Sequence, residues 1–185
     1  MRRSQGITLI ELITTVGIVA ILSSIAVPSF GHLRNDAERT TTVNAFLHAL
    51  YLARSESIKR GQVVSMCKSA DGSTCAAKGA SWRDGWIVFA NDDRDDLPVR
   101  DPDEPVLLVN EGWRAGSIES NREAYSFRPF QQAVVNGTIV FCDPRGSEHA
   151  RAIIISHTGR PRVAQRDSNN RPLKCPALPA RKLKT

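Results

Sequence analysis

Aromatic side chains are scarce in this sequence of 185 residues, and its C-terminal part has none. Phe, Trp and Tyr make up 6% of the chain, and none of them lies between residues 150 and 185. Proteins that hold single-stranded nucleic acid commonly stack its bases on aromatic rings. The C-terminal segment therefore has no stacking platform of its own, and nothing in it resembles a helix that reads the major groove.

The residue patterns of an enzyme or a metal site are also missing. The four cysteines form no CxxC pair, which disfavours zinc. The four histidines, at 32, 48, 149 and 157, show neither metal spacing nor a nucleophile pattern. The acid-rich segment 91–96 lacks the glycine and terminal glutamate of an EF-hand loop, so a solvated turn is the better interpretation. We expect no catalytic residue, no metal and no cofactor.

Charge is almost absent from residues 7–30, where Glu11 is the one acidic or basic side chain. This run of 24 residues exceeds the roughly 20 that span a bilayer core. A carboxylate at the bilayer centre costs roughly 2.5–3.5 kcal/mol even on lenient insertion scales, so such a residue usually has a function. A secretory signal, with Arg2 and Arg3 before the run and Ser24-Ile25-Ala26 as its cleavage site, would leave Glu11 unexplained, and so would a simple anchor.

The segment Gly6-Ile7-Thr8-Leu9-Ile10-Glu11-Leu12 resembles the prepilin signature of type IV pilins and type II secretion pseudopilins. The resemblance implies that a prepilin peptidase cuts between Gly6 and Ile7 and methylates the new amino terminus. Glu11 and Pro28 then take the positions that the family gives them, although Ile7 replaces the usual phenylalanine. A carboxylate in lipid needs a cation or donor as partner. The resemblance supplies one, the free amine at Ile7 of a neighbouring subunit, and the pair would set the axial stagger between subunits.

Helical periodicity continues after the apolar run, from residue 34 to residue 60. The positions spaced i, i+3, i+4 and i+7 are Val43, Phe46, Leu47, Leu50, Tyr51, Arg54 and Ile58. Gly61 suits the position that ends a helix. We expect one helix over residues 7–60, about 80 Å long at 1.5 Å per residue. Pro28 should kink it, because proline removes a backbone hydrogen bond and crowds another.

Seven short extended segments follow Gly61, separated by clusters of Gly, Pro, Asn and Asp. They are Gln62–Lys68, Gly85–Ala90, Pro105–Asn110, Ala124–Arg128, Gly137–Asp143, Arg151–His157 and Arg162–Gln165. Their spacing predicts an antiparallel sandwich or paired sheets. The expected fold is α+β. It consists of a leader over 1–6, a hydrophobic transmembrane and assembly helix over 7–30, an amphipathic helix packed on the head over 31–61, and a β-rich head with a basic tail over 62–185.

The four cysteines form an even set behind an export signal, so disulfides are expected. Three pairings are possible. We favour Cys67–Cys75, which would pin the turn between them, and Cys142–Cys175, which would tie the tail to a strand. In the chain-entropy model these loops contribute roughly 2.5 and 4 kcal/mol respectively.

The net charge of +6 is unevenly distributed. Residues 1–150 carry 16 basic and 18 acidic side chains, whereas residues 151–185 carry nine basic side chains against Asp167 alone, a balance of +8. Such segregation indicates a polyanionic partner, either nucleic acid or anionic lipid.

A second resemblance runs along most of the chain. The stretches ARSESIKRG, SWRDGWIVFAND, VLLVNEG, FCDPRG and IISHTGRPR resemble, in this order, the FimT and GspH group of minor pilins. Gly159-Arg160-Pro161-Arg162 resembles the GRxR motif through which FimT-type minor pilins bind DNA during natural transformation. The resemblance implies that Gly159, Arg160 and Arg162 bind duplex DNA. We expect help from the basic residues of the tail, which matches the group only in its cysteine position and basicity; those residues are Arg166, Arg171 and Lys174.

In an extended segment Arg160 and Arg162 would face the same way, roughly 6.6 Å apart, and present two guanidinium forks to a phosphate backbone. The alternative is an edge strand that uses charge to prevent aggregation. The leading interpretation is a type IV minor pilin, held in the inner membrane with its head in the periplasm and then assembled with other pilin subunits into an extracellular pilus. There it would bind DNA without sequence preference. The alternative is a structural minor pilin or type II secretion pseudopilin that primes the filament and binds only protein.

Overall fold

The computed structural model describes residues 6, 8–95, 97–130 and 136–176, and within the long helix it leaves the side chains of 25–29 undescribed. The chain divides into two compact units, Met1–Glu38 and Arg39–Thr185. The second unit contains all the strands and the core of the head.

Helix α1 spans Leu9–Arg60 without interruption. At its start the Thr8 hydroxyl accepts a hydrogen bond from the backbone N–H of Glu11 at 3.3 Å, which satisfies one of the free donors of the first turn. At its end Gly61 adopts a φ of 68° and donates its N–H to the Ser57 carbonyl. The continuous helix and its end at Gly61 are therefore confirmed, and the kink near Pro28 stays a prediction.

The described apolar side chains of the first unit are exposed, among them Leu9, Ile13, Val16 and Ile21. Among the residues that the structure describes, no helix is both long and apolar enough to cross a membrane. The membrane span expected over residues 7–30 includes 25–29, whose side chains lie outside the described part, and it stays a prediction.

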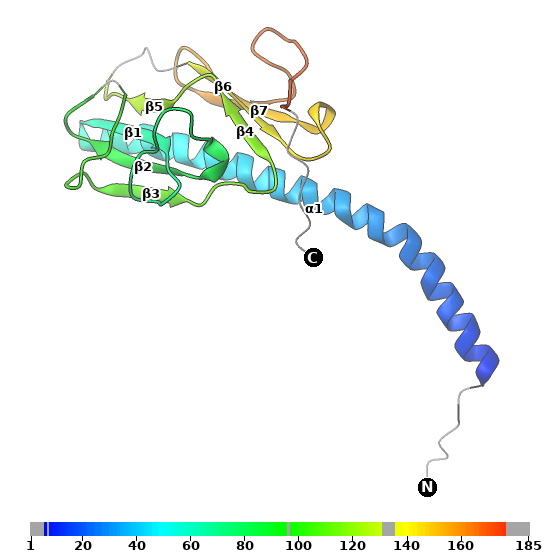
Figure 1. Ribbon diagram of the computed structural model, residues 1–185. Helices are drawn as coiled ribbons and strands as arrows, with labels where there is room; N and C mark the ends of the chain where they lie inside the picture. The colour runs from blue at the N-terminus through cyan, green and yellow to red at the C-terminus, as the bar shows by residue number, and fades with distance from the viewer. Residues whose placement is uncertain (1–5, 7, 96, 131–135, 177–185) are drawn as a thin grey trace. The chain divides into compact units, whose positions relative to one another are not determined.

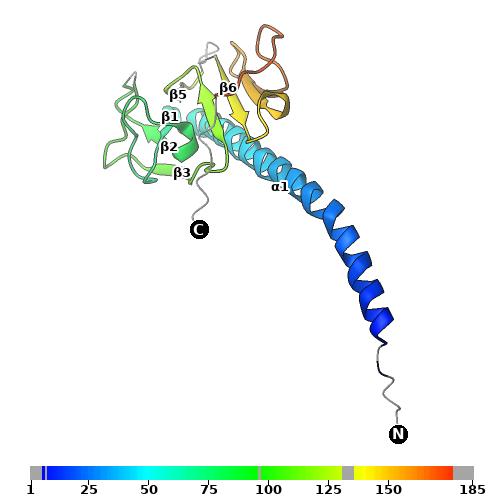
Figure 2. The same cartoon turned by 45° about the vertical axis from the view of Figure 1, so that its right-hand side comes forward.

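The head contains two four-stranded antiparallel sheets, ordered β3-β2-β1-β5 and β4-β6-β7-β8. Figures 1 and 2 show them beside the C-terminal half of α1. The strands are β1 Val63–Lys68, β2 Trp86–Asn91, β3 Val106–Asn110, β4 Ser117–Ser120, β5 Ala124–Phe127, β6 Gly137–Cys142, β7 Arg151–Ile155 and β8 Pro161–Ala164, with short 3-10 helices η1 Trp82–Asp84 and η2 Ser147–His149.

Seven of these strands match the expected segments to within two residues at each end, which is the usual uncertainty of strand and helix boundaries. The expectation missed β4. Its four residues, Ser117–Ser120, include one apolar side chain, Ile118, which is buried in the core. A segment with one apolar side chain shows no strand pattern in the sequence, so β4 is recognised as a strand only through its pairing with β6.

Phe46 of α1 lies at the centre of the core and is fully buried. Its ring centroid is 5.3 Å from that of Trp82, 5.0 Å from Trp86 and 5.6 Å from Phe141, so it joins residues from both sheets. Tyr51 and Ile58, which the helical periodicity assigns to the packing face, are instead half exposed, at 50% and 51%. Both side chains therefore lie at the border between the packed and the exposed faces of the helix. Tyr51 has a separate role described below.

The cysteines pair as we favoured, and each disulfide covers the outer face of one sheet. Cys67 is bonded to Cys75 and packs with Ile87 and Phe89 on the first sheet. Cys142 is bonded to Cys175, and Leu173 beside it packs against the outer face of the second sheet. The tail is therefore attached to the sheet by a covalent bond and by an apolar contact.

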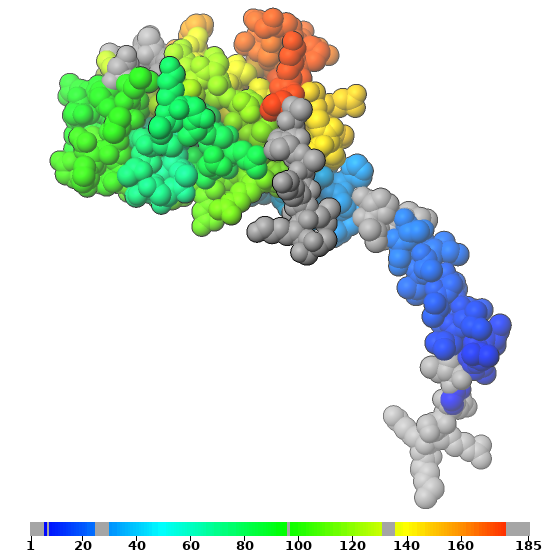
Figure 3. Space-filling model, in the orientation of Figure 1, coloured from blue at the N-terminus to red at the C-terminus, as the bar shows by residue number. Residues whose placement is uncertain are grey.

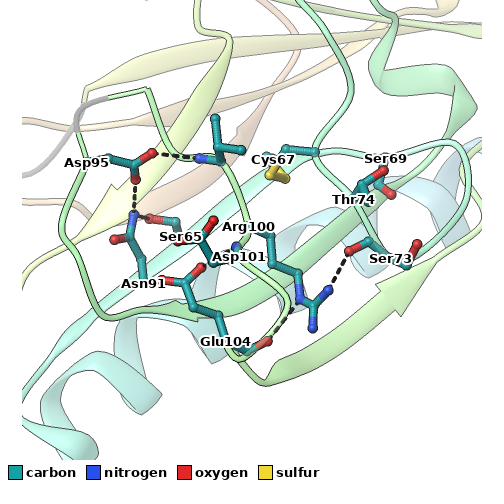
Figure 4. Close-up of a disulfide and its surroundings, with 12 residues drawn as sticks. Ser65, Cys67, Ser69, Ser73, Thr74, Asn91, Asp95, Arg100, Asp101 and Glu104 are labelled. Atoms are coloured by element: carbon teal, nitrogen blue, oxygen red, sulfur yellow. Dashed lines mark hydrogen bonds between the residues drawn. A yellow bond between two sulfur atoms is a disulfide. The ribbon is translucent and has the colours of Figure 1, made fainter.

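Arg100, which follows the acid-rich segment, ties its loop to the first disulfide loop. Figure 4 shows Arg100 donating to the carbonyls of Ser73 and Glu104, both at 2.9 Å. The buried Glu104 carboxylate accepts the backbone N–H of Asp92 at 2.7 Å and that of Asp101 at 3.0 Å. The Glu104 carboxylate thus serves the backbone on both sides of the loop, and within the described ranges no cluster of His, Cys, Asp or Glu could hold a metal ion.

Candidate nucleic-acid interface

The GRxR-like segment forms the turn and the first residues of a β-hairpin. Strands β7 and β8 pair with Ile155 opposite Pro161. Within the turn, Gly159 donates its N–H to the Ser156 carbonyl at 2.8 Å, and Ser156 donates to the Arg160 carbonyl at 3.2 Å. Gly159 has a φ of 70°, a left-handed conformation that side-chain-bearing residues rarely adopt. The glycine of the motif is therefore a geometric requirement of this turn.

Arg160 and Arg162 lie on either side of the buried Pro161, and both are exposed. Arg162 is opposite Ile154, whereas the neighbouring pair Ile155 and Pro161 faces the core side. Because side chains alternate across a strand, Arg162 belongs to the outer face of the sheet. In the described part of the chain, neither arginine side chain has a hydrogen bond or ion pair.

Strand β8 is an edge of the second sheet. This position is also consistent with the alternative role of the arginines, in which their charge prevents other strands from pairing with the free edge.

Two side chains of α1 hold this hairpin from its other side. The Tyr51 hydroxyl donates to the Pro161 carbonyl at 3.2 Å, and Arg54 Nη1 donates to the Thr158 carbonyl at 2.9 Å. Neither contact was predicted from the sequence. The one available signal was a basic residue, Arg54, at an otherwise apolar helical position, and it does not reveal which loop that residue meets.

The tail brings one further arginine to Arg162. A hollow of about 370 Å³ is lined by both Arg162 and Arg166. Arg166 Nη1 donates to the Asn170 carbonyl at 3.1 Å. Figure 3 shows the tail, coloured orange to red, standing out from the surface of the head. Arg166 therefore lies next to Arg162 of the hairpin, and its help in DNA binding stays a prediction.

Arg171 and Lys174, unlike Arg166, do not line the hollow beside Arg162. Arg171 Nε forms an ion pair with an Asp167 carboxylate oxygen at 2.9 Å. Hydrogen bonds from Arg171 to the Asp167 carboxylate, the backbone one foremost, outweigh the effect of burial and hold the pKa of Asp167 below its usual value. The charge of Arg171 is thus largely offset, and Lys174 is exposed without lining the hollow.

The predicted assembly residues lie at the N-terminus. Gly6 is exposed and precedes the helix, and Ile7 lies outside the described residues. Glu11 is in the first turn of α1 with its side chain exposed. Within the described ranges its carboxylate has no ion-pair partner, and its role in assembly stays a prediction.

A buried charge cluster explains the Asp and Arg of the FCDPRG stretch. Asp143, 1% exposed, accepts Arg39 Nη1 at 3.0 Å and Arg145 Nη2 at 2.6 Å. Arg39 also donates to the His149 carbonyl at 2.7 Å. Burial alone would raise the pKa of Asp143, but the hydrogen bonds from Arg145 and the charges of both arginines together hold it below the usual value. The cluster joins α1 to the loop between β6 and β7.

Comparison with known proteins identifies the family. Residues 42–159 match the family model described as type II transport protein GspH, which covers more than half of the chain. The chain belongs to the GspH family. Residues 1–27 match the prokaryotic N-terminal methylation motif, which places the prepilin signature where we expected it. This GspH-family chain is thus a type IV minor pilin or pseudopilin, from a family of structural subunits rather than of enzymes.

Solved structures support the same fold. The chain is similar to the type IV minor pilin FimU of Pseudomonas aeruginosa (strain PAO1) in two crystal forms, each with a TM-score of 0.53. The sequence identities are 18% and 17%, over 75% and 74% of this chain and 96% and 98% of FimU. A likeness at this identity concerns the fold alone. No curated protein gives a significant sequence match.

The GspH family match ends at Gly159, immediately before the two arginines. Membership of the family therefore describes the scaffold that carries the hairpin. What Arg160, Arg162 and the tail do is a separate question.

Proposed function

We propose that this chain is a minor pilin of a type IV pilus that binds duplex DNA, without regard to base sequence, for uptake in natural transformation. The observation that carries the proposal is the joint exposure of Arg160 and Arg162 on a turn of fixed backbone. Guanidinium groups suit phosphate because each presents a planar fork of donors. A rigid turn lowers the entropic cost of placing two of them together.

The charged residues around the hairpin favour the binding of an anion. Arg54 meets the turn from α1, and Arg166 shares a hollow with Arg162. The acidic residue lining that hollow, Asp167, is already paired with Arg171. Binding through such groups neutralises phosphates, so it should be sensitive to salt and indifferent to base sequence.

Replacing both Arg160 and Arg162 with glutamine should weaken binding to duplexes of every sequence. Each lost phosphate contact removes about 0.9 from the slope of log K against log salt, so the double variant should show a slope flatter by roughly two units. The measurement is fluorescence anisotropy of a labelled duplex with the full chain in detergent, across a salt series. Arginine-to-lysine changes at both positions keep the charge but lose the fork, so a partial loss is expected.

Lys78→Gln with Arg114→Gln is the matched control, because it removes two exposed positive charges elsewhere on the head. Arg114 precedes β4, the edge of the second sheet opposite β8. This control should keep the wild-type slope. Equal affinities and slopes for wild type and the folded Arg160/Arg162 double variant would show that these arginines do not bind DNA, and the structural role described next would replace this proposal.

A second candidate is a structural subunit that primes a filament, as a minor pilin or a type II secretion pseudopilin, without binding DNA. The position of Arg162 on the edge strand β8, directly after Arg160 and Pro161, favours it, because charge there opposes unwanted strand pairing. In that case the double glutamine variant would associate through β8 and show no change in DNA affinity.

For either candidate we infer the same processing and assembly. A prepilin peptidase would cut between Gly6 and Ile7 and methylate Ile7. The mature chain would be held in the inner membrane by residues 7–30, with its head in the periplasm, before it joins other pilin subunits in the extracellular pilus. The methylation motif over residues 1–27 supports the processing, and the exposed carboxylate of Glu11 supports the assembly contact.

Intact-mass analysis of the membrane-extracted protein should show a chain that begins at methylated Ile7. Glu11→Ala should leave this mass pattern intact and reduce the amount of the protein in sheared filaments, because the partner of the neighbouring amine is lost. Glu38→Ala, which removes an acid outside the apolar run, is the control and should assemble normally. A chain that starts at Val27 would contradict the processing, and normal incorporation of Glu11→Ala would contradict the assembly contact.

A further inference from the structure

The basic tail contains no aromatic residue, yet the fold brings one to the hairpin. Tyr51 lies on α1, far from the hairpin in sequence, and its hydroxyl binds the Pro161 carbonyl between the two arginines. The residue is 50% exposed. The hydrogen bond fixes the hydroxyl and so orients the half-exposed ring in advance.

The surface around Tyr51 is hollowed and largely uncharged. An open hollow of about 400 Å³ is lined by His48, Tyr51, Leu52, Arg54, Ser55 and Ile58. It thus combines an aromatic ring and two aliphatic side chains with one cation. Arg54 makes one hydrogen bond to the Thr158 carbonyl and has no ion pair within the described residues. These groups suit a ligand that has a flat apolar part, which the ring and the aliphatic side chains would contact, and a neighbouring negative charge, which Arg54 would contact.

We propose that Tyr51 is a stacking platform for an unpaired base of single-stranded DNA, whose adjoining phosphates lie on Arg54 and Arg160. The inference rests on the proposed DNA-binding function and extends it to the form of DNA that is bound. Stacking on an aromatic ring tolerates every base, because every base has a π face. The site therefore stays indifferent to sequence, as phosphate contacts alone are, but it distinguishes an unpaired strand from a duplex whose bases are already stacked.

The contacts assign separate roles to the parts of Tyr51. Its hydroxyl positions the hairpin through Pro161, and its ring is the surface that a base would cover. Removing the hydroxyl alone should weaken the binding of single-stranded and duplex DNA slightly and to the same extent, because the hydroxyl acts through Arg160 and Arg162. Removing the ring should affect the single strand in addition.

The test compares labelled oligothymidine with a labelled duplex, both bound to the full chain in detergent, by fluorescence anisotropy. Tyr51→Leu should weaken oligothymidine binding about 5- to 150-fold, the range measured for loss of one stacked base, and leave duplex affinity within about twofold. Tyr51→Phe keeps the ring and should retain most of the affinity for oligothymidine. Thermal melting by circular dichroism shows that each variant remains folded.

The outcomes separate this inference from the proposed function. If Tyr51→Leu binds oligothymidine as tightly as wild type, or loses both DNAs equally, the stacking role is wrong while Arg160-dependent duplex binding stands. A Tyr51 ring that serves another pilin subunit would give the same unchanged oligothymidine affinity, together with less filament incorporation. If wild type binds neither DNA, both proposals fail. Selective loss of oligothymidine in Tyr51→Leu, with Tyr51→Phe close to wild type, supports the stacking role.

Discussion

Arg39→Met is expected to lower the free energy of unfolding of the head by about 3–5 kcal/mol, the usual cost of removing one partner from a buried ion pair. Arg39 is 5% exposed and donates to both Asp143 and the His149 carbonyl. Its loss leaves Asp143, which is 1% exposed, with Arg145 alone. Urea denaturation followed by tryptophan fluorescence measures the change.

Arg34→Met is the matched control. Arg34 pairs with Glu38 at 2.7 Å, but its side chain is 65% exposed, so this change should cost less than about 1 kcal/mol. Equal effects of the two substitutions would show that the Arg39 cluster contributes no more than a surface pair.

The same cluster makes stability depend on pH. The folded protein holds the pKa of Asp143 below the unfolded value of about 3.9, so the stabilisation is present above that value and is lost as pH falls through the folded pKa. Asp143→Asn should therefore be much less stable than wild type at neutral pH, and the difference should shrink as the solution is acidified below about pH 4. A constant difference across this range would show that the Asp143 charge is not responsible.

Replacing Cys142 and Cys175 together with serine should lower the free energy of unfolding by roughly 4 kcal/mol, because the disulfide closes a loop with a sequence separation of 33 residues. The bond is also the covalent tether between the tail and the second sheet. Hydrogen exchange should consequently rise over residues 165–176, and Arg166 should leave its hollow beside Arg162. Duplex affinity should fall modestly, because the hairpin itself is held by β7 and α1.

Cys67→Ser with Cys75→Ser is the control for this effect. This change removes a disulfide between residues 8 positions apart, so it should lower the free energy of unfolding by roughly 2.5 kcal/mol. Hydrogen exchange in the tail should stay unchanged. If the tail stays equally protected without Cys142–Cys175, its attachment depends on the Leu173 contact instead.

Local patterns were sufficient to predict most of the head. The apolar positions of α1 that include Phe46 follow the helical period, and clusters of Gly, Pro, Asn and Asp mark the ends of the seven predicted strands. The four residues of β4 show no strand pattern, because Ile118 is their one apolar side chain. Disulfide pairing was predictable as a preference, since chain distance favours Cys67 with Cys75 over more distant partners.

The candidate site was predictable only in part. The motif and charge identify Arg160 and Arg162, because both are features of a continuous segment. The contacts of Tyr51 with Pro161 and of Arg54 with Thr158 join residues more than 100 positions apart, so no local pattern reveals them. The pairing of Arg171 with Asp167 likewise depends on a turn in the tail, and it reduces the contribution that the charge count alone would assign to Arg171.

The most direct test of DNA binding at the β7–β8 hairpin is arginine footprinting. Phenylglyoxal modifies accessible arginines, and peptide mass spectrometry reports each site with and without duplex DNA. We predict that DNA protects Arg160 and Arg162 while the exposed Arg114, at the opposite edge of the sheet, reacts as before. If Arg160 and Arg162 are modified to the same extent with saturating DNA as without it, DNA does not bind at this hairpin.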